Sequence, residues 1–388
     1  MRRGLTGRYI KTSTAGDEVV RAFVPNALPP TPPLAIEPAL RSILDEALVA
    51  VGRLDSVGML VPDTSFLYPY VRKEALLSSQ IEGTQSSFSD LLMFESKAAP
   101  GVPTADVVEV SNYARALEHG VKRLRGGFPL SGRLVRELHE LLLSRGRGST
   151  KQRGEYRRSQ NWVGATRPGN AQFVPPPPHE VAGCMGALEK WLHGKPERTP
   201  PLLKAALAHV QFEAIHPFLD GNGRVGRLLI PLSLCAEGVL REPLLYLSLY
   251  LKKHRARYYE LLNEVRIEGE WEEWLSFFAR GVRDTASEAL AVAQDLVALF
   301  QSDRRRVQEL GRLSGSALRA QHALEQRPLT TASRLAARAK LSIPTANKVL
   351  AALERLGIVR EITGRRRERV FVYDRYEQLL ARGTEPLL

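Results

Sequence analysis

Apolar residues recur at spacings of three and four along most of the chain, which is the pattern of helices that bury one face. The pattern predicts helices over residues 37–53, 69–83, 105–124, 131–145, 181–194, 199–214, 224–238, 252–267, 271–285 and 285–310. Residues 1 to about 35 lack this period and end in a proline cluster, so we predict an irregular, extended segment there. The predicted fold class is therefore all-α.

The helical pattern is interrupted in two places. Between residues 150 and 181 the sequence is rich in Gly, Asn, Gln, Trp and Pro, which predicts a loop or a small β-hairpin. After about residue 316, helices predicted at 331–339 and 343–356 are followed by two β-prone pieces, Ile358–Arg360 and Val370–Tyr373. This order of elements is typical of a winged helix-turn-helix domain.

Composition narrows the classes of protein to consider. The 388 residues are 44% hydrophobic and 25% charged, which suits a globular protein of two or three domains. A formal net charge of +13 favours nucleic acid, nucleotide or an acidic protein surface as partner, although a solvated basic surface explains it equally well. Two cysteines and no long apolar run predict a cytoplasmic protein without a disulfide framework, a zinc cluster or a membrane span.

The most informative stretch is residues 216–227, His-Pro-Phe-Leu-Asp-Gly-Asn-Gly-Arg-Val-Gly-Arg, which lies between two predicted helices. Gly221, Asn222 and Gly223 allow a tight turn and a close approach of backbone to a ligand. The helix that follows offers free N–H groups and the positive end of its dipole. These features predict an anion site.

Four side chains of this stretch suit phosphate chemistry. Arg224 and Arg227 lie three residues apart on the first helical turn and can reach phosphate oxygens. Asp220 offers an oxygen ligand for Mg²⁺, and His216 can accept a proton near neutral pH. Each feature alone is more often structural, but their joint occurrence favours phosphoryl-type transfer. The stretch is neither a Walker A loop nor a dinucleotide-binding fingerprint.

This stretch resembles the Fic family signature, His-x-Phe-x-Asp/Glu-Gly-Asn-Gly-Arg-x-x-Arg, at every defined position. The resemblance implies a helical core with a small β-hairpin flap, ATP as substrate, and transfer of AMP to a Ser, Thr or Tyr hydroxyl of a target protein, the enzyme itself included. It implies that His216 is the catalytic base, Asp220 the Mg²⁺ ligand and Phe218 a core anchor. The implied ATP-binding residues are Gly221, Asn222, Gly223, Arg224, Val225, Gly226, Arg227 and Tyr259.

A second motif lies at residues 78–83, Ser-Ser-Gln-Ile-Glu-Gly, and resembles the inhibitory motif of many Fic proteins at Ser78, Glu82 and Gly83. By itself, Glu before Gly is an ordinary helix ending. The resemblance implies that Glu82 pairs with Arg227 in the place of the ATP γ-phosphate and keeps the enzyme inactive. The alternative is a structural salt bridge.

The resemblance also divides the chain. It implies an N-terminal helical region with the inhibitory motif over residues 1–100, a Fic core over 101–285, a connecting helix over 286–315, and a winged helix-turn-helix over 316–388. Residues 156–178 resemble the flap that positions targets, with Gln172–Val174 as a possible edge strand; the alternative is a proline-stiffened loop.

Further roles and rival functions remain open at this level. Tyr258 is predicted to be a core residue beside the nucleotide contact Tyr259. Thr345, Asn347 and Lys348 of the second C-terminal helix, with the Arg-rich turn 364–369, could contact DNA, while such domains also bind proteins or form homodimers. The rivals are transfer of UMP, phosphocholine or phosphate, removal of AMP, and an ATP-sensing DNA-binding regulator without catalysis.

Overall fold

The computed structural model describes residues 2–13, 19–60, 67–96, 104–164, 166–194 and 198–386. Within them, the helices of the main body are α1 (Pro38–Leu60), α2 (Leu67–Ile81), α3 (Phe88–Glu95), α4 (Thr104–Arg125), α5 (Gly132–Leu142), α6 (Pro178–Leu192), α7 (Pro201–Ile215), α8 (Asn222–Ala236), α9 (Ser248–Lys253) and α10 (Arg255–Glu268). The described part of the chain is mostly helical, which confirms the predicted fold class.

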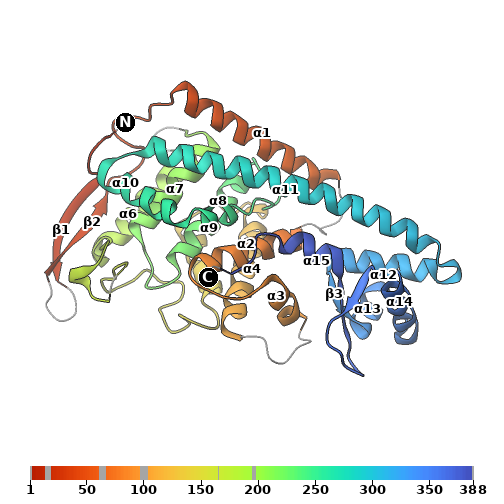
Figure 1. Ribbon diagram of the computed structural model, residues 1–388. Helices are drawn as coiled ribbons and strands as arrows, with labels where there is room; N and C mark the ends of the chain where they lie inside the picture. The colour runs from red at the N-terminus through yellow and green to blue at the C-terminus, as the bar shows by residue number, and fades with distance from the viewer. Residues whose placement is uncertain are drawn as a thin grey trace.

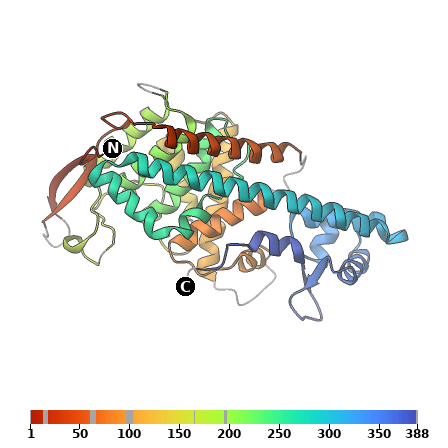
Figure 2. The same ribbon diagram turned by 45° about the horizontal axis from the view of Figure 1, so that its top comes forward.

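One long helix, α11 (Trp271–Gln308), runs from the main body to a C-terminal unit (Figure 1). Helix α1 lies beside its first half in both views (Figure 2). Two separate helices, 271–285 and 285–310, were expected here. That expectation is wrong because no Gly or Pro interrupts the junction, and the Thr285 hydroxyl bonds to the carbonyl of Gly281 within the same helix.

The C-terminal unit contains α12 (Ser314–Gln326), β3 (Leu329–Thr331), α13 (Ala332–Ala339), α14 (Ile343–Arg355), β4 (Val359–Glu361), β5 (Val370–Tyr373) and α15 (Asp374–Ala381). Its three strands form an antiparallel sheet in the order β3-β5-β4. The predicted helices and both strands are present here, whereas α12, β3 and α15 were not predicted. The interpretation as a winged helix-turn-helix and the four domain boundaries stay predictions.

The N-terminal segment contains regular structure that was not predicted: residues 7–13 and 19–25 form two strands, whereas residues 26–35 have no helix or strand, as predicted. Strands β1 (Gly7–Ser13) and β2 (Val19–Pro25) pair antiparallel, from Gly7 opposite Pro25 to Ser13 opposite Val19. Phe23 is fully buried, its ring lies 6.3 Å from that of Phe173, and its N–H donates to the carbonyl of Val174. These partners lie 150 residues away, so no local pattern could reveal the hairpin.

For the flap, the structure has the predicted loop rather than a hairpin of regular strands. In the described residues 156–164 and 166–178, the β-pairing is one antiparallel bridge between Val163 and Phe173. The small hairpin of the main body is thus the N-terminal one, and it lies against the flap. None of the described helices is long and apolar enough to cross a lipid bilayer.

Candidate functional site

The turn between α7 and α8 has a backbone that only certain residues adopt. His216 ends α7 in the left-handed region with φ 49°, and Gly221 precedes α8 with φ 78°. The Asn222 side chain closes the turn, because its Oδ1 accepts from the Phe218 N–H and its Nδ2 donates to the Phe218 carbonyl, both at 2.8 Å. These two hydrogen bonds to the Phe218 backbone stabilise the turn.

Phe218 is fully buried, as expected of a core anchor, and it stacks on His139 with ring centroids 3.7 Å apart. The N–H of Gly154 donates to His139 Nδ1 at 2.9 Å, so Nε2 carries the proton and donates to the carbonyl of Asp220 at 3.1 Å. Burial lowers the pKa of His139 to about 4, so its ring is neutral. Through these contacts His139 stabilises the turn, a role that sequence reasoning missed.

Arg157 is a second residue that sequence reasoning missed. Its guanidinium is buried and donates to the carbonyls of His216 at 2.9 Å and Pro176 at 2.6 Å, while its backbone N–H donates to the carbonyl of Pro217. Burial lowers the pKa of Arg157 to about 10. The available signal was the sequence Gly-Glu-Tyr-Arg at 154–157, where the helical pattern stops.

His216 is held in a neutral state. Burial and the nearby charge of Arg157 lower its pKa to about 4, although a hydrogen bond to the backbone carbonyl of Glu213 acts in the opposite direction. Because that carbonyl accepts a hydrogen bond from one ring N–H, the other ring nitrogen is left as an acceptor. At neutral pH His216 can therefore take a proton from a hydroxyl.

The second motif meets the first, as the resemblance implied. Arg227 Nε donates to the Ser78 hydroxyl at 2.9 Å, and Nη2 donates to the Ser78 carbonyl at 3.0 Å and to Glu82 Oε1 at 2.7 Å. Burial alone would raise the pKa of Glu82, but the charge and hydrogen bond of Arg227 hold it below its usual value. Gly83 follows with φ 97°, a conformation that favours glycine.

Two glycines of the motif leave room for carboxylates. A Cβ on Gly223 would lie 2.5 Å from Glu82 Oε1, and one on Gly226 would lie 2.2 Å from Glu213 Oε1. Both distances are shorter than any real contact, so side chains at these positions would displace the carboxylates. Glycine at 223 and 226 is thus required by the present arrangement of Glu82 and Glu213.

A cavity of about 840 Å³ brings several predicted residues together. Its lining includes Glu82, His216, Gly223, Arg227 and Tyr259, with the apolar side chains of Val210, Leu262, Val265, Ile267 and Trp271. Tyr258 is buried, as expected, and shares a 2.8 Å hydrogen bond with His209. Among the described residues, the lining does not include Asp220, Gly221, Asn222, Arg224, Val225 or Gly226, and Val225 is fully buried in the core.

Arg224 and Asp220 lie on another side of the turn. Arg224 is buried, donates to Glu109 Oε2 at 2.9 Å and lies 3.6 Å from Asp220 Oδ1. The described residues contain no group of three or more His, Cys, Asp or Glu side chains placed to hold a metal. A single, one-third exposed carboxylate such as Asp220 fits Mg²⁺, which takes its other ligands from water and phosphate oxygens.

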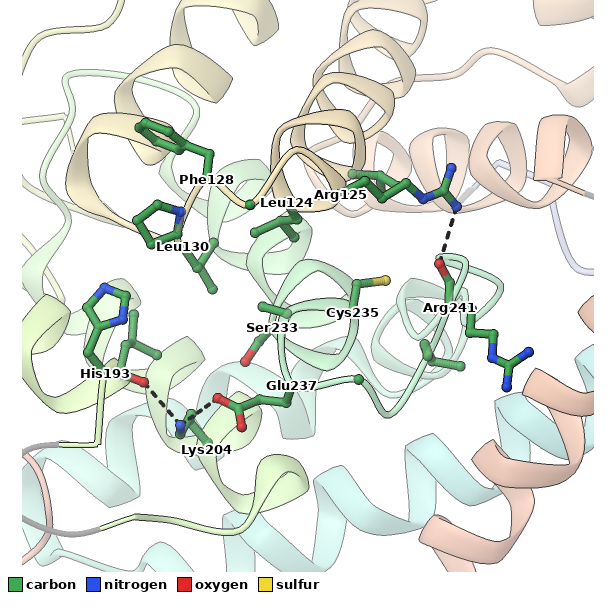
Figure 3. Close-up of a pocket in the computed structure, with 17 residues that line it drawn as sticks. Leu124, Arg125, Phe128, Leu130, His193, Lys204, Ser233, Cys235, Glu237 and Arg241 are labelled. Atoms are coloured by element: carbon green, nitrogen blue, oxygen red, sulfur yellow. Dashed lines mark hydrogen bonds and ion pairs between the residues drawn. The ribbon is translucent and has the colours of Figure 1, made fainter.

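A second cavity, of about 460 Å³, lies at the far end of α8 (Figure 3). Its buried Lys204 donates to Glu237 Oε1 at 2.6 Å and to the carbonyl of Leu192 at 3.0 Å. The ammonium charge is therefore neutralised inside the protein. This cavity contains none of the predicted site residues, so the candidate site is the larger one.

Comparisons with known proteins show which families and structures this chain resembles. Residues 42–122 match the Fic/DOC family N-terminal model and residues 129–234 the Fic/DOC family model. Over 163 residues the chain is 34% identical to a protein adenylyltransferase Fic from Drosophila melanogaster, covering 42% of this chain and 30% of the relative. A protein of the same name from Aedes aegypti is 36% identical over 146 residues, 37% of this chain and 26% of that protein. The chain thus spans about a third or less of these relatives.

Solved structures share the fold. A Fic family protein from Desulfovibrio desulfuricans G20 superposes with a TM-score of 0.56 at 22% identity, over 88% of this chain and 97% of that one. Fic-1 from C. elegans gives a TM-score of 0.51 at 23% identity, over 68% of this chain and 75% of the other.

Proposed function

We propose that this chain, which belongs to the Fic/DOC family, transfers AMP from ATP to a Ser, Thr or Tyr hydroxyl of a target protein. The observation that carries the proposal is the joint presence of a neutral His216, the guanidinium of Arg227 and the open backbone of Gly223 around one cavity. The relatives named protein adenylyltransferase support it.

In the proposed reaction His216 accepts the proton of the target hydroxyl, whose oxygen attacks the α-phosphorus of ATP. A phosphorus–oxygen bond forms there, the bond to the bridging oxygen of the β-phosphate breaks, and pyrophosphate leaves. General base catalysis of this kind contributes roughly 10²–10⁴-fold to the rate. Arg227 and the N-terminus of α8 stabilise the phosphate charges. Mg²⁺, held by Asp220 and phosphate oxygens, would neutralise further charge.

Glu82 is proposed to inhibit this reaction. Its carboxylate accepts from Nη2 of Arg227, the group that the terminal phosphate of ATP would need, and its negative charge repels a phosphate placed beside it. ATP would therefore bind weakly, or in an unreactive pose, until the contact opens. Among the residues described, Ser78 is the other side chain that bonds Arg227, and it stays in place when Glu82 leaves.

The proposal also covers how a target docks and what the C-terminal unit binds. The flap is proposed to contact the target through Val163 and Phe173, which line the cavity. The edge at Gln172–Val174 is already partly used, because Phe173 pairs with Val163 and the carbonyl of Val174 accepts from the Phe23 N–H. Asn347 and Lys348 of α14 are exposed, which supports contact with DNA or a protein, including a second copy of the chain.

The test is incubation with Mg²⁺ and ATP labelled at the α-phosphate, with γ-labelled ATP in parallel. Label from the α-position should appear on protein, rise in Glu82→Gly and vanish in His216→Ala. Label only from the γ-position would indicate phosphate transfer instead. ATP binding without label in any variant, together with tight binding of duplex DNA, would support the regulator.

A further inference from the structure

Glu213 is a partly buried residue beside the site, and the proposed reaction leaves its carboxyl group unused. It lies on α7 one helical turn before His216 and lines the same cavity. Its Oε1 is inaccessible to water and has no hydrogen-bond partner among the described residues. Leaving such an oxygen unpaired costs about 1–3 kcal/mol, and a rotation of the carboxyl group that lets it pair with a ligand in the cavity would recover that amount.

The position of Glu213 indicates which part of a nucleotide it would meet. Gly226, whose Cα lies against its Oε1, directly precedes Arg227 in α8. On its other side Glu213 interacts electrostatically with Tyr258 and Tyr259. A nucleotide with its phosphates at Arg227 and its base among the apolar residues of the lining has its sugar between these two regions.

We propose that Glu213 recognises the ribose hydroxyls of ATP and so makes the site specific for ribonucleotides. A carboxyl group can accept hydrogen bonds from two neighbouring hydroxyls, a pairing that nucleotide-binding proteins commonly use. Burial raises the pKa of Glu213 to about 7, so the group is also available as a donor near neutral pH. The inference rests on one part of the proposed function, the binding of ATP in this cavity, and does not depend on AMP transfer.

The experiment compares the affinities of ATP and 2′,3′-dideoxy-ATP by calorimetry, in Glu82→Gly protein so that the inhibitory contact does not mask binding. Loss of the hydroxyls should weaken binding about tenfold or more. The further change Glu213→Val should abolish that discrimination, and Glu213→Gln, which keeps the shape and the hydrogen bonds, should retain much of it. Discrimination that persists in Glu213→Val overturns the inference. Discrimination that follows Glu213 without any label transfer overturns the proposed function and leaves the inference standing.

A second, independent observation concerns the end of the chain. After α15 the chain returns to the main body and reaches α2, the helix that precedes Glu82 (Figure 1, Figure 2). Gln80 Nε2 donates to the carbonyl of Thr384 at 2.7 Å, and Gln80 Oε1 accepts from Lys252 Nζ at 2.7 Å. Lys252 in turn donates to the carbonyls of Gly383 and Glu385. Gln80, Lys252 and Thr384, which make this contact, are all buried.

The C-terminal unit holds the same region at two further points. The Ser89 hydroxyl of α3 donates to Glu377 of α15 at 2.5 Å, and the Arg327 guanidinium lies 3.6 Å from the ring centre of Tyr68 in α2. Gln80 and Glu82 are two residues apart and so point to different sides. Arg227 thus holds one side of this segment while the C-terminal residues hold another.

We infer that the docked residues Gly383–Glu385 keep α2 in the position from which Glu82 reaches Arg227. A change that lifts this tail from α2 would then release the inhibition. The inference rests on the proposed function, since it needs an activity that Glu82 restrains.

A matched pair of glycine substitutions tests this. Both Gly383 and Gly364 have positive φ, but a Cβ on Gly383 would lie 2.9 Å from Leu249 Cδ1, whereas one on Gly364 meets nothing within 4 Å. Gly383→Ala should therefore lift the tail and raise label transfer severalfold towards the level of Glu82→Gly, and Gly364→Ala should not. Lys252→Met, which removes three hydrogen bonds to the contact, should act like Gly383→Ala.

The outcomes separate the two ideas. The role of the tail is overturned if Glu82→Gly transfers label while Gly383→Ala and Lys252→Met, both folded, transfer no more label than the wild type. An inactive Glu82→Gly protein overturns the proposed function itself. Equal activation by Gly364→Ala also overturns the inference, because it would trace the effect to backbone strain in the C-terminal unit.

Discussion

Removing the carboxylate of Glu82 should change stability and ATP affinity in opposite directions. Truncating one partner of a fully buried ion pair costs about 3–5 kcal/mol. Arg227 is 1% exposed but Glu82 is 32% exposed, and Arg227 keeps both bonds to Ser78. The expected loss for Glu82→Gly is therefore smaller, about 1–3 kcal/mol in the free energy of unfolding.

The same free energy opposes ATP in the wild type, because the phosphate must break the Glu82–Arg227 contact before it binds. Glu82→Gly should then bind ATP about 5- to 150-fold more tightly. At ATP concentrations of about 100 times Kd, binding adds about 2.7 kcal/mol and restores the stability of the variant. Urea denaturation with and without ATP, together with calorimetry, measures both quantities.

A matched control is Glu237→Gln, which breaks the Lys204–Glu237 pair at 2.6 Å in the other cavity. It should lower the stability by a similar amount and leave ATP affinity unchanged. The reasoning is refuted if Glu82→Gly and wild type bind ATP within about twofold of each other, a difference of about 0.4 kcal/mol. Glu82 would then be a structural salt bridge that ATP does not have to open.

Three other outcomes follow from particular contacts. Gly120→Ala should destabilise the protein by about 1–3 kcal/mol, because its Cβ would lie 2.7 Å from a methyl group of Leu232, a buried residue of α8. Gly52→Ala, whose Cβ would enter open space, should stabilise the protein by up to about 1 kcal/mol. Thermal denaturation of both variants measures the two changes. Arg157→Lys should reduce label transfer by about tenfold or more without changing ATP affinity, because it loses bonds to the carbonyls that fix His216, and an unchanged rate would contradict this. Glu213 has a folded pKa of about 7, above its ordinary 4.5, so its stabilising contribution is lost as pH rises through that range. Between pH 5 and pH 7 the wild type should lose more stability than Glu213→Gln by urea denaturation, and parallel curves would refute the raised pKa.

The sequence predicted the helices well and the site in part. The meeting of Glu82 with Arg227 was expected, because each belongs to a short motif that can be recognised without knowing the fold. His139 and Arg157 could not be found in this way, since an isolated His or Arg carries no pattern and only the packing of α5 and the flap brings them to the turn. Glu213 lies in an ordinary helical sequence, and its unpaired Oε1 results from packing against Gly226 of the next helix.

The hairpin β1–β2 illustrates the same limit for the fold. Its strands are stabilised by the flap, which lies far away in the chain, so proline content and missing helical periodicity pointed to irregular structure. The opposite error at α11 arose from dividing a continuous apolar stripe into two helices.

The length of α11 has a consequence for target choice. A continuous helix of 38 residues is about 57 Å long and stiff on the timescale of catalysis. Its first residue, Trp271, lines the larger cavity, and its last turn packs on the C-terminal unit. Under the proposed function, a target protein held by the C-terminal unit would present to His216 only those hydroxyls that lie at a fixed distance from the surface by which it binds.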